Sequence, residues 1–189
     1  YPSHKEVQNL IKELQIDAKD EKSSHDFGKN IIPKMLKDGY KIQIYNFAQN
    51  EFPGMTPSEK GYWRDVGTLS SLHEANMDIA LGNCEMNLYD SSTGKIFTED
   101  THSMAQYIGP SGSVKSSLVN QGAFVLGDID TCVVSNEAVV EPNAVCTRCV
   151  IMNGAVVGKD AKVNNAIIGP DAVIEAGEEV NVDGKSIVL

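Results

Sequence analysis

One short stretch of the chain places an acidic side chain between aromatic residues and a helix start. Residues 62–68 have the sequence YWRDVGT, in which Asp65 follows Trp63 by two positions and precedes Thr68 by three. We expect Asp65 at the end of a strand and Thr68 as a helix cap, because α/β sheets collect ligands where strands end and helices begin. An aromatic ring at Trp63 could flank a sugar. The alternative is structural, with a buried tryptophan and a capping or ion-paired aspartate, and the spacing alone favours it.

The four cysteines offer a second candidate for chemistry. Cys146 and Cys149 form a C-x-x-C pair, which is compatible with zinc binding or redox activity. No second pair and no nearby histidine completes a ligand set, since the last histidine is His102. Four cysteines are also too few for a disulfide scaffold in a chain of 189 residues. We therefore expect buried, reduced thiols and a cytoplasmic protein.

The overall charge argues against two classes of partner. Sixteen lysines and arginines against 26 aspartates and glutamates give a formal net charge of −10. Such a chain repels phosphate backbones and anionic lipids, so we expect neither nucleic-acid nor membrane-surface binding. No apolar run approaches the roughly 20 residues that span a bilayer. Hydrophobic residues make up 41% of the chain, which is enough for a sizeable core.

Residues 1–82 carry helix signals and one strand signal. Ser3 and Glu6 predict a capping box at the start of a first helix. A second helix begins at Ser24 or Asp26 and ends before Gly39, which requires Pro33 to lie in its first turn. Residues 40–45 alternate between apolar and polar types, as a strand does, and residues 68–81 predict a third helix that ends before a glycine. This is too little for a complete sheet, and we expect the closing part of a larger α/β domain.

Residues 83–113 show little periodicity and are rich in small and polar residues, so we expect an extended connection. Several apolar residues within it suggest that it packs on another part of the protein; they are Met86, Leu88, Tyr89, Ile96, Phe97 and Tyr107.

The last part of the chain, residues 114–189, repeats every 17 residues. Ala138, Ala155 and Ala172 fall in one column, and within each row apolar residues recur about every six positions. This pattern predicts three short strands per coil, with alanine inside and Asn, Gly or Asp at the corners. Cys132 and Cys149 are also 17 residues apart, so they should stack in adjacent coils. The hexapeptide type of this pattern belongs to left-handed parallel β-helices.

Two functions compete for such a coil. Hexapeptide acyltransferases use a histidine between coils as a general base. All four histidines precede residue 114, which leaves the coil without that base; they are His4, His25, His73 and His102. The other function is architectural or regulatory, with the chemistry carried by the α/β part.

Three motifs resemble a known family. They are SHDFGKNIIP at residues 24–33, GYWRDVGT at residues 61–68 and EANMD at residues 74–78. In this order, followed by a hexapeptide coil, they resemble the bacterial glucose-1-phosphate adenylyltransferases, also called ADP-glucose pyrophosphorylases. The resemblance implies a mainly β chain, in which the C-terminal part of an α/β nucleotidyltransferase domain precedes a left-handed parallel β-helix.

The resemblance also implies a reaction and a set of site residues. The family makes ADP-glucose and pyrophosphate from ATP and glucose 1-phosphate, for glycogen synthesis, with Mg²⁺ as the cofactor. Asp65 matches one of two aspartates that hold the metal and is therefore the expected catalytic residue. Asp26, Phe27 and Trp63 match positions that line the glucose 1-phosphate pocket. Arg64 could contact a phosphate, although a structural ion pair is the better interpretation.

Departures from the family limit what this chain does alone. The glycine-rich nucleotide loop of the family has no counterpart here, since the chain contains neither Gly-Gly nor Gly-x-Gly. We therefore expect the 189-residue chain alone to be inactive, and the complete protein to be a regulated homo- or hetero-oligomer, typically a tetramer. Lys185 could bind an effector, or could simply be a solvated lysine. A GDP- or dTDP-sugar enzyme and a non-catalytic regulatory subunit remain alternatives.

Overall fold

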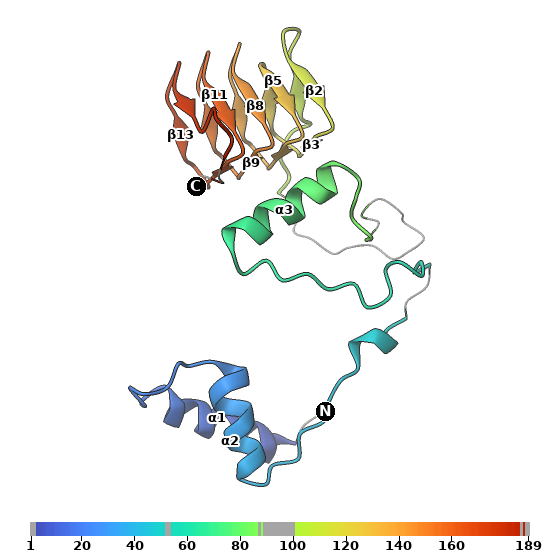
Figure 1. Ribbon diagram of the computed structural model, residues 1–189, viewed down its shortest axis with the longest axis vertical. Coiled ribbons are helices and arrows are strands. Elements are labelled where there is room, and N and C mark those ends of the chain that lie inside the picture. The colour runs from blue at the N-terminus through green and yellow to red at the C-terminus, as the bar shows by residue number, and fades with distance from the viewer. Residues whose placement is uncertain (1–2, 52–53, 87, 89–100, 186, 188–189) are drawn as a thin grey trace. The chain divides into compact units, whose positions relative to one another are not determined.

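The computed structural model describes residues 3–51, 54–86, 88, 101–185 and 187 of the chain (Figure 1). It divides into two compact units, Tyr1–Phe47 and Ala48–Leu189, which are described separately below. The domain boundaries expected at residues 82 and 113 stay predictions. Tyr89, Ile96 and Phe97 of the expected connection lie outside the described residues.

The first unit begins with helix α1 (His4–Asp17). Its capping box is the predicted one: the Ser3 hydroxyl accepts from the Glu6 amide at 3.4 Å, and the Glu6 carboxylate accepts from the Ser3 amide at 2.6 Å. Glu13 is buried on the inner side of α1 and forms an ion pair with Lys34. This pair joins α1 to the second helical segment.

The second helical segment starts at Asp26 and runs from η1 (Phe27–Ile31), a π-helical turn, into α2 (Ile32–Lys37). Asp26 is the cap, because its Oδ1 accepts from the Lys29 amide at 2.7 Å. Pro33 lies in the first turn of α2, where its missing N–H costs no helical hydrogen bond. Gly39 follows with a φ of 80°, the left-handed conformation that ends many helices. The predicted second helix is confirmed.

The predicted strand at residues 40–45 is wrong. These residues form neither helix nor strand, and the side chains of Ile44 and Tyr45 are 88% and 73% exposed. The alternation of apolar and polar residues indicates only which side chains would face a core if the segment were a strand. A strand also needs a neighbouring strand that completes its backbone hydrogen bonds. The described part of this unit contains no strand that could serve as the neighbour. A short 3-10 turn, η2 (Phe47–Gln49), follows.

Helix α3 (Leu69–Ala80) belongs to the second unit and matches the predicted third helix. The Thr68 hydroxyl accepts from the Ser71 amide at 3.1 Å, and Gly82 follows the helix with a φ of 71°. Residues 62–66, where we expected a strand ending at Asp65, are irregular instead. The helix could be predicted because its cap involves residues that are close in sequence. A strand could not, because it depends on a second strand that pairs with it.

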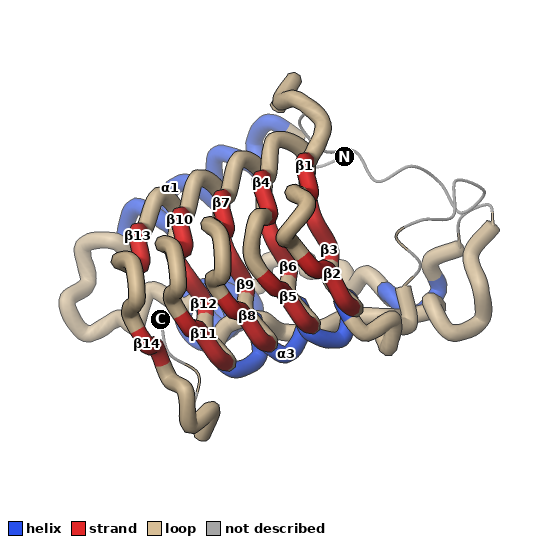
Figure 2. The backbone as a smooth tube through the Cα atoms, turned by 90° about the horizontal axis from the view of Figure 1, so that it is seen from above, coloured by secondary structure: helices blue, strands red, loops and turns tan. Residues whose placement is uncertain are grey.

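The rest of the second unit is a parallel β-helix with three sheets (Figure 2). The first sheet contains β1 (Tyr107–Ile108), β4 (Phe124–Val125), β7 (Val139–Val140), β10 (Val156–Val157) and β13 (Val173–Ile174). The second contains β2 (Ser113–Lys115), β5 (Asp128–Asp130), β8 (Val145–Thr147), β11 (Lys162–Asn164) and β14 (Glu179–Val180). The third contains β3 (Leu118–Val119), β6 (Val133–Val134), β9 (Val150–Ile151) and β12 (Ile167–Ile168). The predicted parallel β-helix is confirmed, and its first strand, β1, starts at Tyr107.

Small side chains fill the interior of the β-helix, as the 17-residue repeat predicts. Ala138, Ala144, Ala155 and Ala161 have no exposed surface. Each coil therefore buries its inner residues against the next, so the stability of the β-helix is a sum over neighbouring coils.

One coil is two residues shorter than the others. Val139 pairs with Val156, a step of 17 residues, whereas Phe124 pairs with Val139, a step of 15. The shortening lies at the corner between β4 and β5, and Gly127 stands there. A Cβ atom on Gly127 would lie 2.4 Å from the carbonyl oxygen of Ala144, so only glycine fits this corner.

Candidate functional site

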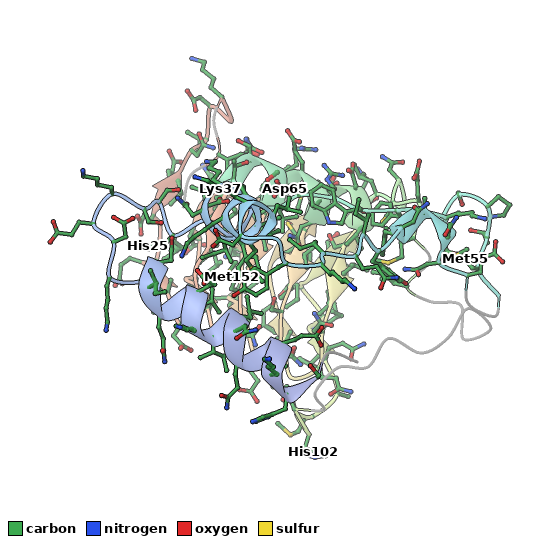
Figure 3. All side chains as sticks on the ribbon, turned by 90° about the horizontal axis from the view of Figure 1, so that it is seen from below. His25, Lys37, Met55, Asp65, His102 and Met152 are labelled. Atoms are coloured by element: carbon green, nitrogen blue, oxygen red, sulfur yellow. The ribbon has the colours of Figure 1, made fainter. Side chains whose placement is uncertain are left out.

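One carboxylate oxygen of Asp65, a residue labelled in Figure 3, accepts a hydrogen bond from the backbone, and the other has no partner among the described residues. Its Oδ1 accepts from the Gly67 amide at 2.8 Å, which fixes the turn that leads into α3. Within the described residues, Oδ2 has no hydrogen-bond partner, and the side chain is exposed. The turn thus orients the carboxylate and leaves one oxygen free for a ligand.

Arg64 is held on α3 by two acidic side chains. Its guanidinium forms an ion pair with Asp78, and its Nη2 lies 3.7 Å from the Glu74 carboxylate. The hydrogen bond to Asp78 is the main cause that raises the pKa of Arg64 above its ordinary value. The structural ion pair favoured from the sequence is therefore the observed one, and Arg64 anchors the segment that carries Asp65.

The other predicted site residues lie at the surface. Trp63 is 73% exposed, so its structural interpretation as a buried tryptophan is wrong. Phe27 is 50% exposed, and the Asp26 carboxylate is engaged as the helix cap. Asp26 and Phe27 belong to the first unit, and Trp63 and Asp65 to the second. Their convergence on one sugar-phosphate pocket stays a prediction.

Asp17 and His25 form a pair that the sequence did not predict. Asp17 Oδ1 accepts from the Ser23 hydroxyl at 2.6 Å, and its Oδ2 lies 3.2 Å from His25 Nδ1. The hydroxyl, followed by the histidine, keeps the pKa of Asp17 below its ordinary value. Asp17, His25 and Phe27 line a cavity of about 280 Å³. The motif around Asp26 pointed to this area, but no pattern connects residues 17 and 25 before the chain is folded.

The residues present can supply part of a magnesium site. Among the residues that the structure describes, no three acidic, histidine or cysteine side chains gather as a metal-binding group. Asp65 offers one free carboxylate oxygen. That is compatible with Mg²⁺, which keeps several waters and binds through one or two carboxylates together with substrate phosphates.

The C-x-x-C pair lies in the interior of the β-helix. All four cysteines are free thiols, and Cys132, Cys146 and Cys149 have no exposed surface. Burial raises the pKa of the Cys146 thiol, and a hydrogen bond with Cys132 is the main cause that raises the pKa of Cys149. Protonated, inaccessible thiols neither bind zinc nor exchange disulfides. The expectation of buried, reduced cysteines is confirmed for Cys132, Cys146 and Cys149, whereas Cys84 is partly exposed.

Comparison with known proteins places both parts of the chain in one family. A family model described as Nucleotidyl transferase matches residues 7–81, and one described as GlmU-like, C-terminal hexapeptide matches residues 101–186. A glucose-1-phosphate adenylyltransferase of Corynebacterium jeikeium is 38% identical over 180 residues, which are 94% of this chain and 44% of the relative. The chain is a partial homologue of the bacterial glucose-1-phosphate adenylyltransferases.

Further members of this enzyme family agree with that assignment. The glucose-1-phosphate adenylyltransferase of Clostridium kluyveri is 39% identical over 69% of this chain and 31% of its own length. That of Clostridium perfringens strain 13 is 42% identical over 72% of this chain and 31% of its own length. The chain thus spans less than half of these relatives and corresponds to their C-terminal part. No described helix is both long and apolar enough to cross a membrane.

Proposed function

We propose that this chain is the C-terminal part of an enzyme that makes ADP-glucose and pyrophosphate from ATP and glucose 1-phosphate, as a step of glycogen synthesis. The observation that carries the proposal is the similarity to the Corynebacterium jeikeium enzyme across 94% of the chain, through both the nucleotidyltransferase segment and the β-helix. In the reaction, a phosphate oxygen of glucose 1-phosphate attacks the α-phosphorus of ATP. The bond between the α-phosphorus and the bridging oxygen breaks, and pyrophosphate leaves.

Asp65 is the proposed catalytic residue. Its turn with Gly67 directs the free Oδ2 toward solvent, where it can serve as one ligand of Mg²⁺. When bound, Mg²⁺ neutralises charge on the phosphates during transfer. Arg64 has no phosphate role in this proposal, because Asp78 and Glu74 already neutralise its charge.

Trp63, Phe27 and Asp26 are the residues that we propose to contact glucose 1-phosphate, because they match positions of the family that line its pocket. Trp63 offers an exposed indole that can cover one face of the glucose ring. Phe27 offers a second exposed ring, beside the Asp17 and His25 pair. Asp26 can accept from a sugar hydroxyl through the carboxylate capacity that the Lys29 amide leaves free.

The β-helix serves assembly and regulation. The end strands of a β-helix offer backbone groups that neighbouring subunits can cover. We propose a homo- or hetero-oligomer in which ATP is bound by a glycine-rich segment that residues 1–189 do not contain. The chain alone is then inactive.

The decisive experiment uses the complete gene product and the 189-residue chain side by side. Formation of ADP-glucose from ATP and glucose 1-phosphate is measured with Mg²⁺ present. We expect turnover by the complete product only, and a fall in kcat of roughly 100- to 1,000-fold in D65N, because loss of one charged metal ligand weakens transition-state stabilisation. D171N is the matched control: Asp171 is an exposed corner residue of the β-helix with a φ of 56°, which asparagine also adopts.

The alternatives give different outcomes. Turnover with GTP or dTTP in place of ATP would assign the protein to a GDP- or dTDP-sugar enzyme. Unchanged turnover in D65N, with the oligomer intact, would assign Asp65 a structural role instead of a metal-binding one. No turnover by the complete product would favour a non-catalytic regulatory subunit. Measurable ADP-glucose synthesis by the 189-residue chain would contradict the proposal that another segment completes the site.

A further inference from the structure

Helix α3 contacts the β-helix through one of its faces. His73 is 1% exposed, and its Nε2 lies 2.7 Å from the backbone carbonyl oxygen of Arg148, at a corner of the β-helix. Met77, one turn later, is 2% exposed and packs with Val150 and Ile167 of the third sheet. His73 and Met77 are four residues apart and therefore lie on the same side of the helix.

A neighbouring face of α3 holds the segment that carries the candidate catalytic residue. Glu74 and Asp78 are also four residues apart, and both pair with Arg64. Asp65 follows Arg64 directly, and its turn with Gly67 leads into the Thr68 cap of the same helix. Asp65 is thus tied to α3 from both sides: through the ion pairs of Arg64 before it and through the helix cap after it.

We infer that α3 is a positioning helix, through which His73 and Arg64 fix the place of Trp63 and Asp65 relative to the β-helix. The functional half of this inference rests on the proposed function. The structural half is that the contact between α3 and the β-helix keeps residues 62–66 in place. This half does not depend on the proposed function.

The chemistry of His73 suits a positioning role better than a simple filling of space. A leucine would occupy the same apolar site, but it could not donate to the Arg148 carbonyl. Loss of that donor leaves the carbonyl without its partner, so α3 would shift or loosen until water reached the oxygen. Because Arg64 and Thr68 tie residues 62–68 to α3, such a shift would be passed to Asp65.

Trp63 provides a direct reporter of this effect, since it is the single tryptophan of the chain. Time-resolved fluorescence anisotropy of the 189-residue chain measures local motion of the indole on the nanosecond scale. We expect H73L to increase the amplitude of local motion by about a factor of two, as for a loop released on that timescale. We expect R64Q to do the same, because it removes the ion pairs with Asp78 and Glu74.

Two variants serve as controls. In H73Q, the new side-chain amide can donate to the same carbonyl. The local motion of Trp63 in H73Q should therefore be close to that of the original chain and smaller than in H73L. R148N changes the side chain of the accepting residue but leaves its carbonyl in place, and asparagine tolerates the φ of 53° at this corner. R148N should therefore match the original chain. Circular dichroism confirms in each case that the β-helix stays folded.

The complete gene product then tests the functional half. We expect H73L to lower kcat about tenfold with little change in KM for glucose 1-phosphate, because a misplaced ligand affects the transition state most. H73Q should recover most of this loss.

The failure of each proposal is distinguishable. Unchanged Trp63 anisotropy in both H73L and R64Q overturns the inference, whatever the activity. Altered anisotropy with unchanged kcat overturns its functional half, provided that D65N abolishes turnover. If the complete gene product makes no ADP-glucose, the proposed function fails, and if D65N leaves turnover unchanged, only the proposed role of Asp65 fails. In either case the anisotropy measurements still decide whether α3 positions the segment.

Discussion

The helical first unit and the β-helix use apolar residues in opposite ways. Among the described residues of the first unit, only Ile31 and Glu13 are buried, while Val7, Ile11 and Leu36 are at least 40% exposed. In the β-helix, 17 buried residues form one continuous cluster that runs through the coils.

This difference follows from how each region completes its core. A coil buries its interior against the similar geometry of the next coil, so this interior needs no other element. An amphipathic helix must find its apolar partner elsewhere in the domain. The exposed apolar residues of α1 and α2 therefore agree with membership in a larger nucleotidyltransferase domain, of which this chain carries the segment at residues 7–81.

The largest expected effect concerns the short corner of the β-helix. In G127A, the new Cβ atom would meet the Ala144 carbonyl oxygen at 2.4 Å and that of Glu141 at 2.7 Å. Backbone atoms of a packed coil cannot move aside without breaking the ladder. We expect a loss of roughly 3 kcal/mol in the free energy of unfolding, within the range of severe packing mutations. Urea unfolding followed by circular dichroism of the β-signal measures it.

The matched control is G169A, in the same β-helix. A Cβ atom on Gly169 would meet no atom within 4 Å, and its backbone is outside the left-handed region. We expect a change within about 0.5 kcal/mol, or a small gain, because alanine restricts the unfolded chain more than glycine does. Equal losses in the two variants would show that the corner of Gly127 is not as tightly closed as the structure has it.

Much of the β-helix was predictable from the sequence, because its repeat is local and periodic. The alanine columns predicted the interior, and the stacking of Cys132 and Cys149 followed from their spacing. The corners were less predictable. Asn143 and Asp160 have the expected types, but Glu137, Arg148 and Thr131 occupy the same left-handed conformation. At those corners the hydrogen bonds of the neighbouring coils impose the conformation, whatever the residue type.

The candidate site was predictable only where it depends on local contacts. The caps at Asp26 and Thr68 involve residues three positions apart, and both are present. The ion pair of Arg64 needed only a neighbouring helix. His73 donates to a residue 75 positions away, and no sequence pattern marks such a contact. The strand expected at Asp65 failed for the related reason that strands require distant partners.

The second expected effect compares thiol reactivity in the two regions. Cys84 is partly exposed, whereas Cys132, Cys146 and Cys149 are buried in the β-helix. With a thiol reagent at pH 8 we expect one fast-reacting group, and three that react at least about 100-fold more slowly because the coils must open first. A cysteine introduced by I11C in α1 should react fast, since Ile11 is 47% exposed.

The denatured chain provides the check on these thiols. Without reductant, it should show four reactive groups, because all four cysteines are free. C84S should remove the fast phase and leave the slow one unchanged. More than one fast group in the native chain, or fewer than four after denaturation, contradicts the buried and reduced arrangement.

The smallest expected effect is the response of the first unit to acid. The Ser23 hydroxyl holds the pKa of Asp17 below its ordinary value of about 3.9. A carboxyl group with a depressed pKa stabilises the fold at neutral pH, and this contribution is lost as the pH falls through the folded-state pKa. S23A removes the main cause of the depression. The part of the circular dichroism signal at 222 nm that α1 and α2 contribute should therefore decline at a higher pH than in the original chain, while α3 of the second unit keeps its share.

We expect acid to destabilise the β-helix less than the helical first unit. The interior of the β-helix contains no carboxylate, and the pair of Asp130 with Lys115 lies at the surface. We expect the β-sheet signal to persist at a pH where the helical signal has fallen. S58A, which removes an exposed hydroxyl from the second unit, should leave both transitions in place. If S23A shifts the β-sheet signal as well, or shifts neither signal, then the link between Ser23 and Asp17 does not govern the acid response of the helical unit.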